Sequence, residues 1–309
     1  MTKRVPTTEP LREQLRGWGH RLSGGPGAIP VVVEAQDRKI GKAAAWSVLL
    51  GLYVLFFGRG TYTALSILLS GEVVQASEVS LQRNLDSALF SLARVVLIVA
   101  VALFVVRGLG ISNRRAGLMN PWSRERTKLE FKIGCLAELF TVGGFILTTA
   151  LAGLLSHPTP AYPTGDLSLN LNWLSELSSS FAAGPMEELL LVVILVWLLR
   201  AAGYSWTVVC VAAVTLRVLF HLYYGWPALG LALWPLMVIY LYKSSGAILG
   251  IIIAHSAFDL FGTFGKLAEQ AGFSGLSTVL YGLKLAPAAI GLFYIWRTSE
   301  ARPRSPLAR

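Results

Sequence analysis

The chain has 309 residues, of which 54% are hydrophobic and only 14% are charged. So little polar surface cannot cover a soluble globular protein of this size, and the composition therefore indicates an integral membrane protein. The formal net charge is +10, but the Lys and Arg residues gather in the termini and in short loops between apolar runs, as orientation signals do. We therefore expect anionic lipid headgroups, and no nucleic acid, as the partner of the basic residues.

The sequence divides into three parts. Residues 1–42 are basic and rich in proline and glycine, a composition that cannot build a core of its own, and we predict a cytoplasmic tail. Residues 43–297 form one polytopic transmembrane domain, and residues 298–309 form a second basic tail in the cytoplasm. This organisation predicts a multi-pass protein of the cell membrane with both termini in the cytoplasm.

Eight apolar runs have about the length that is needed to cross a bilayer. In chain order they cover residues 43–69, 88–106, 133–155, 174–199, 206–223, 229–242, 247–264 and 277–296. Eight spans place both ends of the chain on the side of the strongly basic loop at residues 107–132, while the loop at residues 157–172 has no Lys or Arg and should face outward. The predicted fold class is therefore all-α, a polytopic membrane protein with about eight transmembrane helices.

Few ionisable side chains lie inside these runs. The densest group comes from three spans and consists of Glu187, Glu188, Arg217, His221, His255 and Asp259. Arg217 and His221 are four residues apart, as are His255 and Asp259, so each pair projects from one face of its helix. Because an ionised side chain is costly at this depth, we expect the group to be functional.

Imidazoles beside carboxylates suit two kinds of hydrolytic chemistry. They can hold a divalent transition metal such as zinc, or a carboxylate can activate water directly as a general base. Proton-coupled transporters also line their cavities with Glu, His and Arg, so a transporter is the alternative from a different class. For Arg94 and Glu138, on neighbouring spans, we expect a structural ion pair, whereas Lys284 has no obvious partner.

The same residues resemble the three motifs of the CPBP (CAAX protease and bacteriocin-processing) family of intramembrane proteases, EExxxR, FxxxH and HxxxN/D. The matching residues are Glu187-Glu188, then His221 within residues 217–225, then His255-Ser-Ala-Phe-Asp259, in the order of the family and within residues 174–264. The resemblance implies about eight helices around a polar intramembrane cavity. It also implies an endopeptidase in which a glutamate-activated water cleaves a peptide bond of a membrane-associated protein or peptide.

Carried over by position, the resemblance gives each residue a role. Glu187 would be the general base and Glu188 its support. His221, His255 and Asp259 would bind a metal or stabilise the oxyanion. For a divalent metal such as zinc, the candidate ligands are His221, His255 and Glu188.

The sequence departs from the family pattern at two positions. The motif arginine falls at Val192, and the phenylalanine of FxxxH falls at Arg217. We interpret these departures as one exchange, in which an arginine lost from one helix returns on the next and faces the glutamates, so Arg217 joins the predicted site. A non-proteolytic membrane protein of the same fold is the second alternative, and no pattern in the sequence specifies the oligomeric state.

Overall fold

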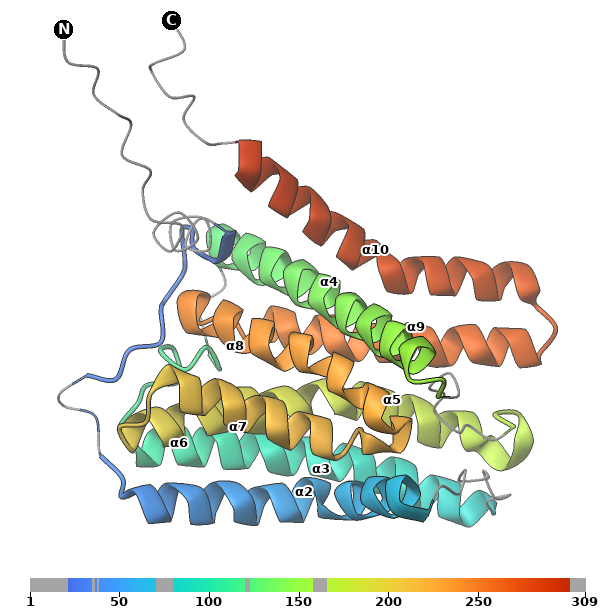
Figure 1. Cartoon of the computed structure of the whole chain (residues 1–309), viewed down its shortest axis with the longest axis horizontal. Helices are drawn as coiled ribbons and strands as arrows, with labels where there is room; N and C mark the ends of the chain where they lie inside the picture. The colour runs from blue at the N-terminus through green and yellow to red at the C-terminus, as the bar shows by residue number, and fades with distance from the viewer. Residues whose placement is uncertain are drawn as a thin grey trace, which may run out of the picture.

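The computed structural model describes residues 22–34, 37, 39–70, 80–119, 123–157 and 166–300. Over these residues the regular structure is helical, and the helices pack into one bundle (Figure 1). Most of the predicted amino-terminal tail and residues 301–309 of the predicted carboxy-terminal tail lie outside the described residues. The prediction of an all-α polytopic membrane protein is confirmed by the helices that follow.

The successive spans of the described chain run in opposite directions along the bundle (Figure 1). The helices are α2 (Lys42–Ser70), α3 (Leu81–Gly108), α4 (Arg124–Leu154), α5 (Asn172–Glu188), α6 (Leu195–Ala201), α7 (Trp206–Leu219), α8 (Leu233–Ser245), α9 (Leu249–Gln270) and α10 (Ser274–Glu300). A π-helix, η2 (Leu189–Ile194), joins α5 to α6 so that the three form one span, and three short 3-10 helices are η1 (Leu169–Leu171), η3 (Leu222–Tyr224) and η4 (Trp226–Ala232). Within the described residues, seven helices are long and apolar enough to cross a membrane, and α7 is a shorter apolar helix.

The fifth predicted span is shorter than the sequence suggests. We predicted a span to residue 223, but α7 ends at Leu219 and has only 14 residues, about 21 Å of helix where the hydrocarbon core measures about 30 Å. The chain then turns through η3 and η4 before it enters α8. Gly225 joins these turns with a φ of 72°, a conformation that glycine adopts without a steric penalty. Irregular backbone at membrane depth is tolerated where protein surrounds it.

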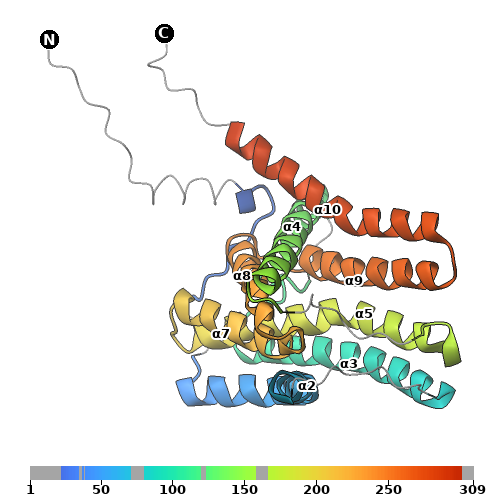
Figure 2. The same cartoon turned by 45° about the vertical axis from the view of Figure 1, so that its right-hand side comes forward.

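The continuous segment α5–η2–α6 lies at the centre of the bundle (Figure 2). Helices α3 and α9 pack against α5, while α2, α3, α7 and α8 contact η2. Residues 190–199 are consequently at most 2% exposed. A helix that is enclosed in this way keeps its polar side chains out of lipid, which is a condition for charged groups at this depth.

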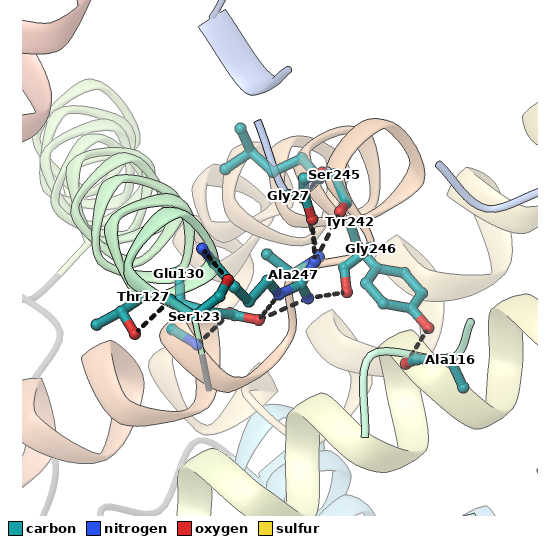
Figure 3. A network of polar contacts seen from close by, with 12 residues as sticks. Gly27, Ala116, Ser123, Thr127, Glu130, Tyr242, Ser245, Gly246 and Ala247 are labelled. Carbon is teal, nitrogen blue, oxygen red and sulfur yellow. Dashed lines mark hydrogen bonds and ion pairs between the residues drawn. The ribbon is translucent and has the colours of Figure 1, made fainter. Parts of the chain in front are cut away.

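The described part of the amino-terminal segment, residues 22–34, lies over one end of the bundle, and we call it the strap. On α4, the guanidinium of Arg126 donates hydrogen bonds to the carbonyl oxygens of Gly27 at 3.0 Å and Gly246 at 2.7 Å (Figure 3). The same guanidinium donates to the Glu130 carboxylate at 2.9 Å, and the backbone N–H of Ile29 donates to the Ser245 carbonyl at 2.9 Å. One arginine therefore connects the strap, α4 and the turn between α8 and α9.

The ion pair that we expected between Arg94 and Glu138 does not form, so that prediction is wrong. Arg94 on α3 donates to the backbone carbonyl of Phe56 on α2 and lies over the rings of Phe56 and Phe90. The physical reason is the packing order, because α3 packs on α5 whereas α4 packs on α8, α9 and α10. The consecutive helices α3 and α4 therefore pack on different partners, and Glu138 faces another part of the bundle.

Candidate functional site

The structure brings residues of all three predicted motifs together inside the bundle. Glu187 and Glu188 are the last residues of α5, Arg217 lies in the last turn of α7, and His255 lies in the first half of α9. The two glutamates lie near the middle of the span that runs from Leu169 to Ala201. The site is therefore at membrane depth and is enclosed by helices.

Glu188 is the residue that joins the three helices. Its Oε1 accepts a hydrogen bond from Arg217 Nη1 at 2.8 Å and from His255 Nδ1 at 2.9 Å. The side chain of Glu188 is 0% exposed. An isolated charge at such a place would be very costly, and two charge-assisted contacts to one oxygen offset that cost. Glu188 is thus held in one position by partners from α7 and α9.

Glu187 is much less engaged than its neighbour. The nearest cation contact of its carboxylate is Oε2 to Arg217 Nη1 at 3.6 Å, and this oxygen has no hydrogen-bond partner among the described residues. The side chain keeps 10% of its surface exposed. Both carboxylates have an Oε2 without a hydrogen-bond partner among the described residues, but only Glu188 is also fixed through its Oε1 by partners from two other helices.

Arg217 faces both glutamates, which is the position that the proposed exchange requires. Its Nε and Nη2 are buried and find no hydrogen-bond acceptor within the described part of the chain. Val192, at the position of the family arginine, is buried in η2. The site consequently has one guanidinium, supplied by α7, with two nitrogens, Nε and Nη2, still able to donate.

A close approach between α5 and α9 sets the distance between the glutamates and His255. A Cβ on Gly184 would lie 2.3 Å from Ser256 Oγ and 2.5 Å from the carbonyl oxygen of Ile252. Only glycine leaves space for the two helices at this separation. Directly after the glutamates, η2 adds the wider turn of a π-helix, an element that is rare and often found at functional sites.

His221 lies in the turn after α7 and not within a helix, as the predicted span required. Its Nδ1 is 2.8 Å from the carbonyl oxygen of Arg217, and since a carbonyl can only accept, Nδ1 carries the proton. In the neutral ring, Nε2 then presents a free lone pair. Asp259 lies at the edge of the site, where its Oδ2 is 3.6 Å from His255 Nε2 and its side chain is 34% exposed.

Trp234, the second residue of α8, belongs to the site and was missed in the sequence. Its ring centroid lies 4.3 Å from the guanidinium carbon of Arg217 and 4.6 Å from the ring centroid of His255, at an interplanar angle of 84°. The ring of His221 is 6.4 Å away. The chain has nine tryptophans, and nothing in the local sequence distinguishes this one from the others.

These side chains, as they are arranged, do not present the ligand set expected for a metal. His255 directs Nδ1 to Glu188 and Nε2 toward Asp259, so both ring nitrogens face carboxylates. The oxygen of Glu188 is shared between His255 and Arg217. Over the residues that the structure describes, no group of three or more His, Cys, Asp or Glu side chains is placed to hold a metal ion. The divalent metal therefore stays a prediction from the resemblance.

Comparison with known proteins gives one family. Residues 169–261 match the family model described as "Type II CAAX prenyl endopeptidase Rce1-like". No match was found among curated proteins or among solved structures. The matched residues contain both glutamates, Arg217, His221, His255 and Asp259. The resemblance to the CPBP family that the three motifs predicted is therefore confirmed as a similarity over residues 169–261, which are less than half of the chain.

Proposed function

We propose that the protein is an intramembrane endopeptidase that hydrolyses a peptide bond of a membrane-associated protein or peptide. The observation that carries the proposal is the contrast between two adjacent carboxylates. Glu188 is held through its Oε1 by Arg217 and His255, whereas the nearest cation contact of Glu187 is at 3.6 Å and its side chain keeps 10% of its surface exposed. A positioned carboxylate with a free oxygen in an enclosed site suits general base catalysis.

In the proposed reaction, Glu187 is the general base. Its carboxylate takes a proton from a water molecule, the water oxygen forms a bond to the carbonyl carbon, and the carbonyl π electrons move onto the carbonyl oxygen. When this tetrahedral species collapses, the C–N bond breaks and Glu187 returns the proton to the leaving nitrogen. Atoms and charge balance without any other reactant than water and the peptide.

The negative oxygen of the tetrahedral species needs hydrogen-bond donors that are already in position. Arg217 offers Nε and Nη2, which are buried and without an acceptor among the described residues. His255 offers a second positive group beside Glu188 when both of its nitrogens are protonated. We assign Glu188 and Asp259 to the orientation of these two groups, and His221 to the wall beside Arg217.

The proposal also includes the orientation of the protein in the membrane, its lipid partners and a divalent metal. The start of α2 and the end of α10 lie at one end of the bundle (Figure 1), and the basic loop between α3 and α4 supports placing that end in the cytoplasm of the cell membrane, against anionic headgroups. A divalent metal such as zinc would act as a Lewis acid if it binds. Elemental analysis of purified protein tests for the metal, and no step above depends on it.

The function is tested with purified protein in lipid nanodiscs and a library of quenched fluorescent peptides with apolar segments. We expect cleavage by the wild type and none by Glu187→Gln or His255→Ala. Glu176→Gln is the matched control, because it neutralises another partly buried glutamate of α5 outside the site. A wild-type protein that cleaves no peptide while it moves a solute into liposomes contradicts the proposal and supports the transporter.

A further inference from the structure

Helix α2 lies outside the residues of the family match, yet it packs against the end of α7 that carries Arg217. Phe57 of α2 stacks on Phe220, with 4.6 Å between the ring centroids and an interplanar angle of 16°. One turn earlier, Tyr53 is only 5% exposed, and its hydroxyl donates a hydrogen bond to the carbonyl oxygen of Leu216 at 3.0 Å. Helix α2 therefore contacts the residue directly before Arg217 and the turn that follows α7.

The hydroxyl of Tyr53 satisfies a carbonyl that the end of α7 leaves open. The last carbonyl oxygens of a helix have no partner within the helix, and at membrane depth the protein itself must supply one. A longer helix would direct the N–H of Phe220 to the carbonyl of Leu216, but here this N–H is directed to Val218. Tyr53 supplies the missing hydrogen bond, and it thereby fixes the backbone one residue before Arg217.

The direction of these hydrogen bonds decides what Tyr53 can do. A tyrosine hydroxyl carries one proton, and a carbonyl can only accept, so the proton of Tyr53 lies on the bond to Leu216. The hydroxyl oxygen is also 2.7 Å from Thr61 Oγ1, and in this contact Thr61 is consequently the donor. The charge of Glu187 acts on Tyr53 as well, which puts the hydroxyl close to the proposed base. Because its proton is used for Leu216, Tyr53 holds the backbone and does not donate to the reacting peptide.

We propose that Tyr53 is a positioning residue for Arg217, so that α2 completes a reaction site whose other side chains come from residues 169–261. The inference rests on the proposed endopeptidase function. Arg217 Nη1 donates to Glu188 Oε1 at 2.8 Å, while Nε and Nη2 are kept for the oxyanion. A displacement of the end of α7 would move these donors, and a misplacement of about 1 Å can reduce a rate by about 10²-fold.

A competing interpretation connects Tyr53 directly with Glu187, whose charge acts on it. The two interpretations differ in one measurable respect. If Tyr53 acts through Arg217, the effects of substitutions at these two positions are coupled, and if it acts on Glu187 they are independent.

The kinetic experiment uses the full chain in nanodiscs and one fluorescent peptide that the wild type cleaves. We expect Tyr53→Phe, which removes only the hydroxyl, to lower kcat at least about tenfold with little change in KM. Tyr62→Phe is the matched control and should cleave like the wild type, because Tyr62 lies on the same helix and is 73% exposed. The double variant Tyr53→Phe/Arg217→Lys should be about as slow as Arg217→Lys alone.

A second pair of variants tests the same hydrogen bond without a change at Tyr53. Thr61→Val removes the hydroxyl that donates to Tyr53 and should lower kcat in the same direction by a smaller factor. Thr61→Ser retains a hydroxyl and should recover most of the rate. Thermal unfolding shows whether each variant is folded, and if Tyr53→Phe does not fold, Thr61→Val takes its place in all comparisons.

A spectroscopic measurement follows Arg217 without any cleavage. The full chain is labelled with ¹⁵N-arginine, and the ¹H–¹⁵N spectrum of the arginine side chains is recorded in detergent micelles. The Nε signal of Arg217 is identified by its loss in Arg217→Lys. Because this Nε is buried and has no acceptor among the described residues, its signal responds to movement of the guanidinium. Tyr53→Phe should shift the signal, and Tyr62→Phe should leave it in place.

Two results overturn the inference. One is a Tyr53→Phe variant that has the kcat of the wild type or an unshifted Arg217 signal. The other is a double variant in which the two losses of kcat multiply, since this result assigns Tyr53 to Glu187. A wild type that cleaves no peptide refutes the endopeptidase, and the Arg217 signal then decides alone. A shift in Tyr53→Phe but not in Tyr62→Phe supports the positioning role in that case, and an unshifted signal refutes it.

Discussion

Ser256 donates a hydrogen bond from Oγ to the carbonyl oxygen of Phe181 at 2.9 Å. In a regular helix this carbonyl accepts from the N–H of residue 185, but residue 185 is a proline and has no N–H. The serine that follows His255 in the third motif thus replaces the hydrogen bond that the proline before the two glutamates removes. The helix that carries the carboxylates and the helix that carries the histidine are connected by this contact.

Removal of that hydroxyl should destabilise the site. We expect Ser256→Ala to lower the free energy of unfolding by about 1 kcal/mol, because a buried carbonyl loses its partner, and to reduce peptide cleavage through movement of α9. Ser178→Ala is the control, since the Ser178 hydroxyl donates to the Leu174 carbonyl of its own helix. Thermal unfolding and cleavage rates are measured in the same detergent. If Ser256→Ala and Ser178→Ala have the same unfolding temperature and the same cleavage rate, the contact with Phe181 does not stabilise the site.

The two glutamates should respond differently to the same substitution. Glu187→Gln should reduce the cleavage rate by about 10²- to 10⁴-fold, the usual contribution of a general base, with unchanged stability. Glu188→Gln should abolish cleavage and also lower stability by about 3 kcal/mol, because Arg217 and His255 lose their shared carboxylate. Stability is followed by thermal unfolding of the helical signal. The reverse pattern would assign the base to Glu188.

Gly184 should tolerate no side chain. In Gly184→Ala the new methyl group would meet Ser256 Oγ and the Ile252 carbonyl well inside contact distance, so α5 must move away from α9. We expect a loss of about 1–3 kcal/mol, as for other overpacked sites, and a strong loss of cleavage. Gly282→Ala on α10 is the matched control. A Cβ at Gly282 would meet no described atom within 4 Å apart from the neighbouring backbone of its own helix. The prediction fails if both variants unfold at the wild-type temperature.

Trp234 should act as a positioning residue for Arg217 and His255. We expect Trp234→Leu to lower kcat at least about tenfold with little change in KM, because the ring wall that both groups contact is lost. Trp234→Phe should recover most of the rate, since it retains an aromatic face of similar shape. Steady-state kinetics on one fluorescent peptide separates the two parameters. A leucine variant with wild-type kcat would exclude the role.

Acid should weaken the attachment of Asp37, which lies in a loop outside the spans. Arg115 donates to its two carboxylate oxygens at 2.7 and 2.9 Å and also lies 3.5 Å from Glu34. These contacts, with Arg115 as the main cause, hold the pKa of Asp37 below its usual range. A lowered pKa in the folded state adds stability at neutral pH, and this stability is lost as the pH falls through the lowered value.

The measurement for this pair is the unfolding temperature of the wild type and of Asp37→Asn between about pH 7 and pH 3. We expect the wild type to be the more stable protein at neutral pH and the difference to shrink in acid. Arg115→Gln should give the same pattern as Asp37→Asn. A difference that is constant over the whole range would show that the ion pair does not contribute.

Much of the fold could be predicted because hydrophobic length is a direct consequence of bilayer thickness. The spans that we predicted from the sequence coincide with helices except at α7. This helix ends early because the chain turns inside the protein, and a turn made of apolar residues cannot be recognised from hydrophobicity. The grouping of Glu188, Arg217 and His255 was predictable because charges in apolar helices must find partners. The roles of these residues stay predictions.

The sequence does not show which helices pack against one another. Arg94 and Glu138 lie on consecutive spans, yet α3 and α4 pack on different helices, so a pairing inferred from chain order is wrong. Trp234 was missed for a related reason, since its contacts come from α7 and α9 and leave no local pattern. Lys284, which has no obvious partner in the sequence, lies over the ring of Phe258 because α10 packs beside α9. Each of these cases depends on which helices are neighbours.

The strap at residues 22–34 is synthesised before the helices that it contacts, and it can dock on all of them only after α8 has been made. The Ser244 hydroxyl of α8 donates to the hydroxyl of Ser23, which is 221 residues away in the sequence. Because chains are made from the amino terminus, the ribosome has already produced α2 to α8 before the strap finds these partners. A docked strap therefore requires a chain that extends at least to Ser245, so docking of the strap would report the completion of α8 in a nascent chain.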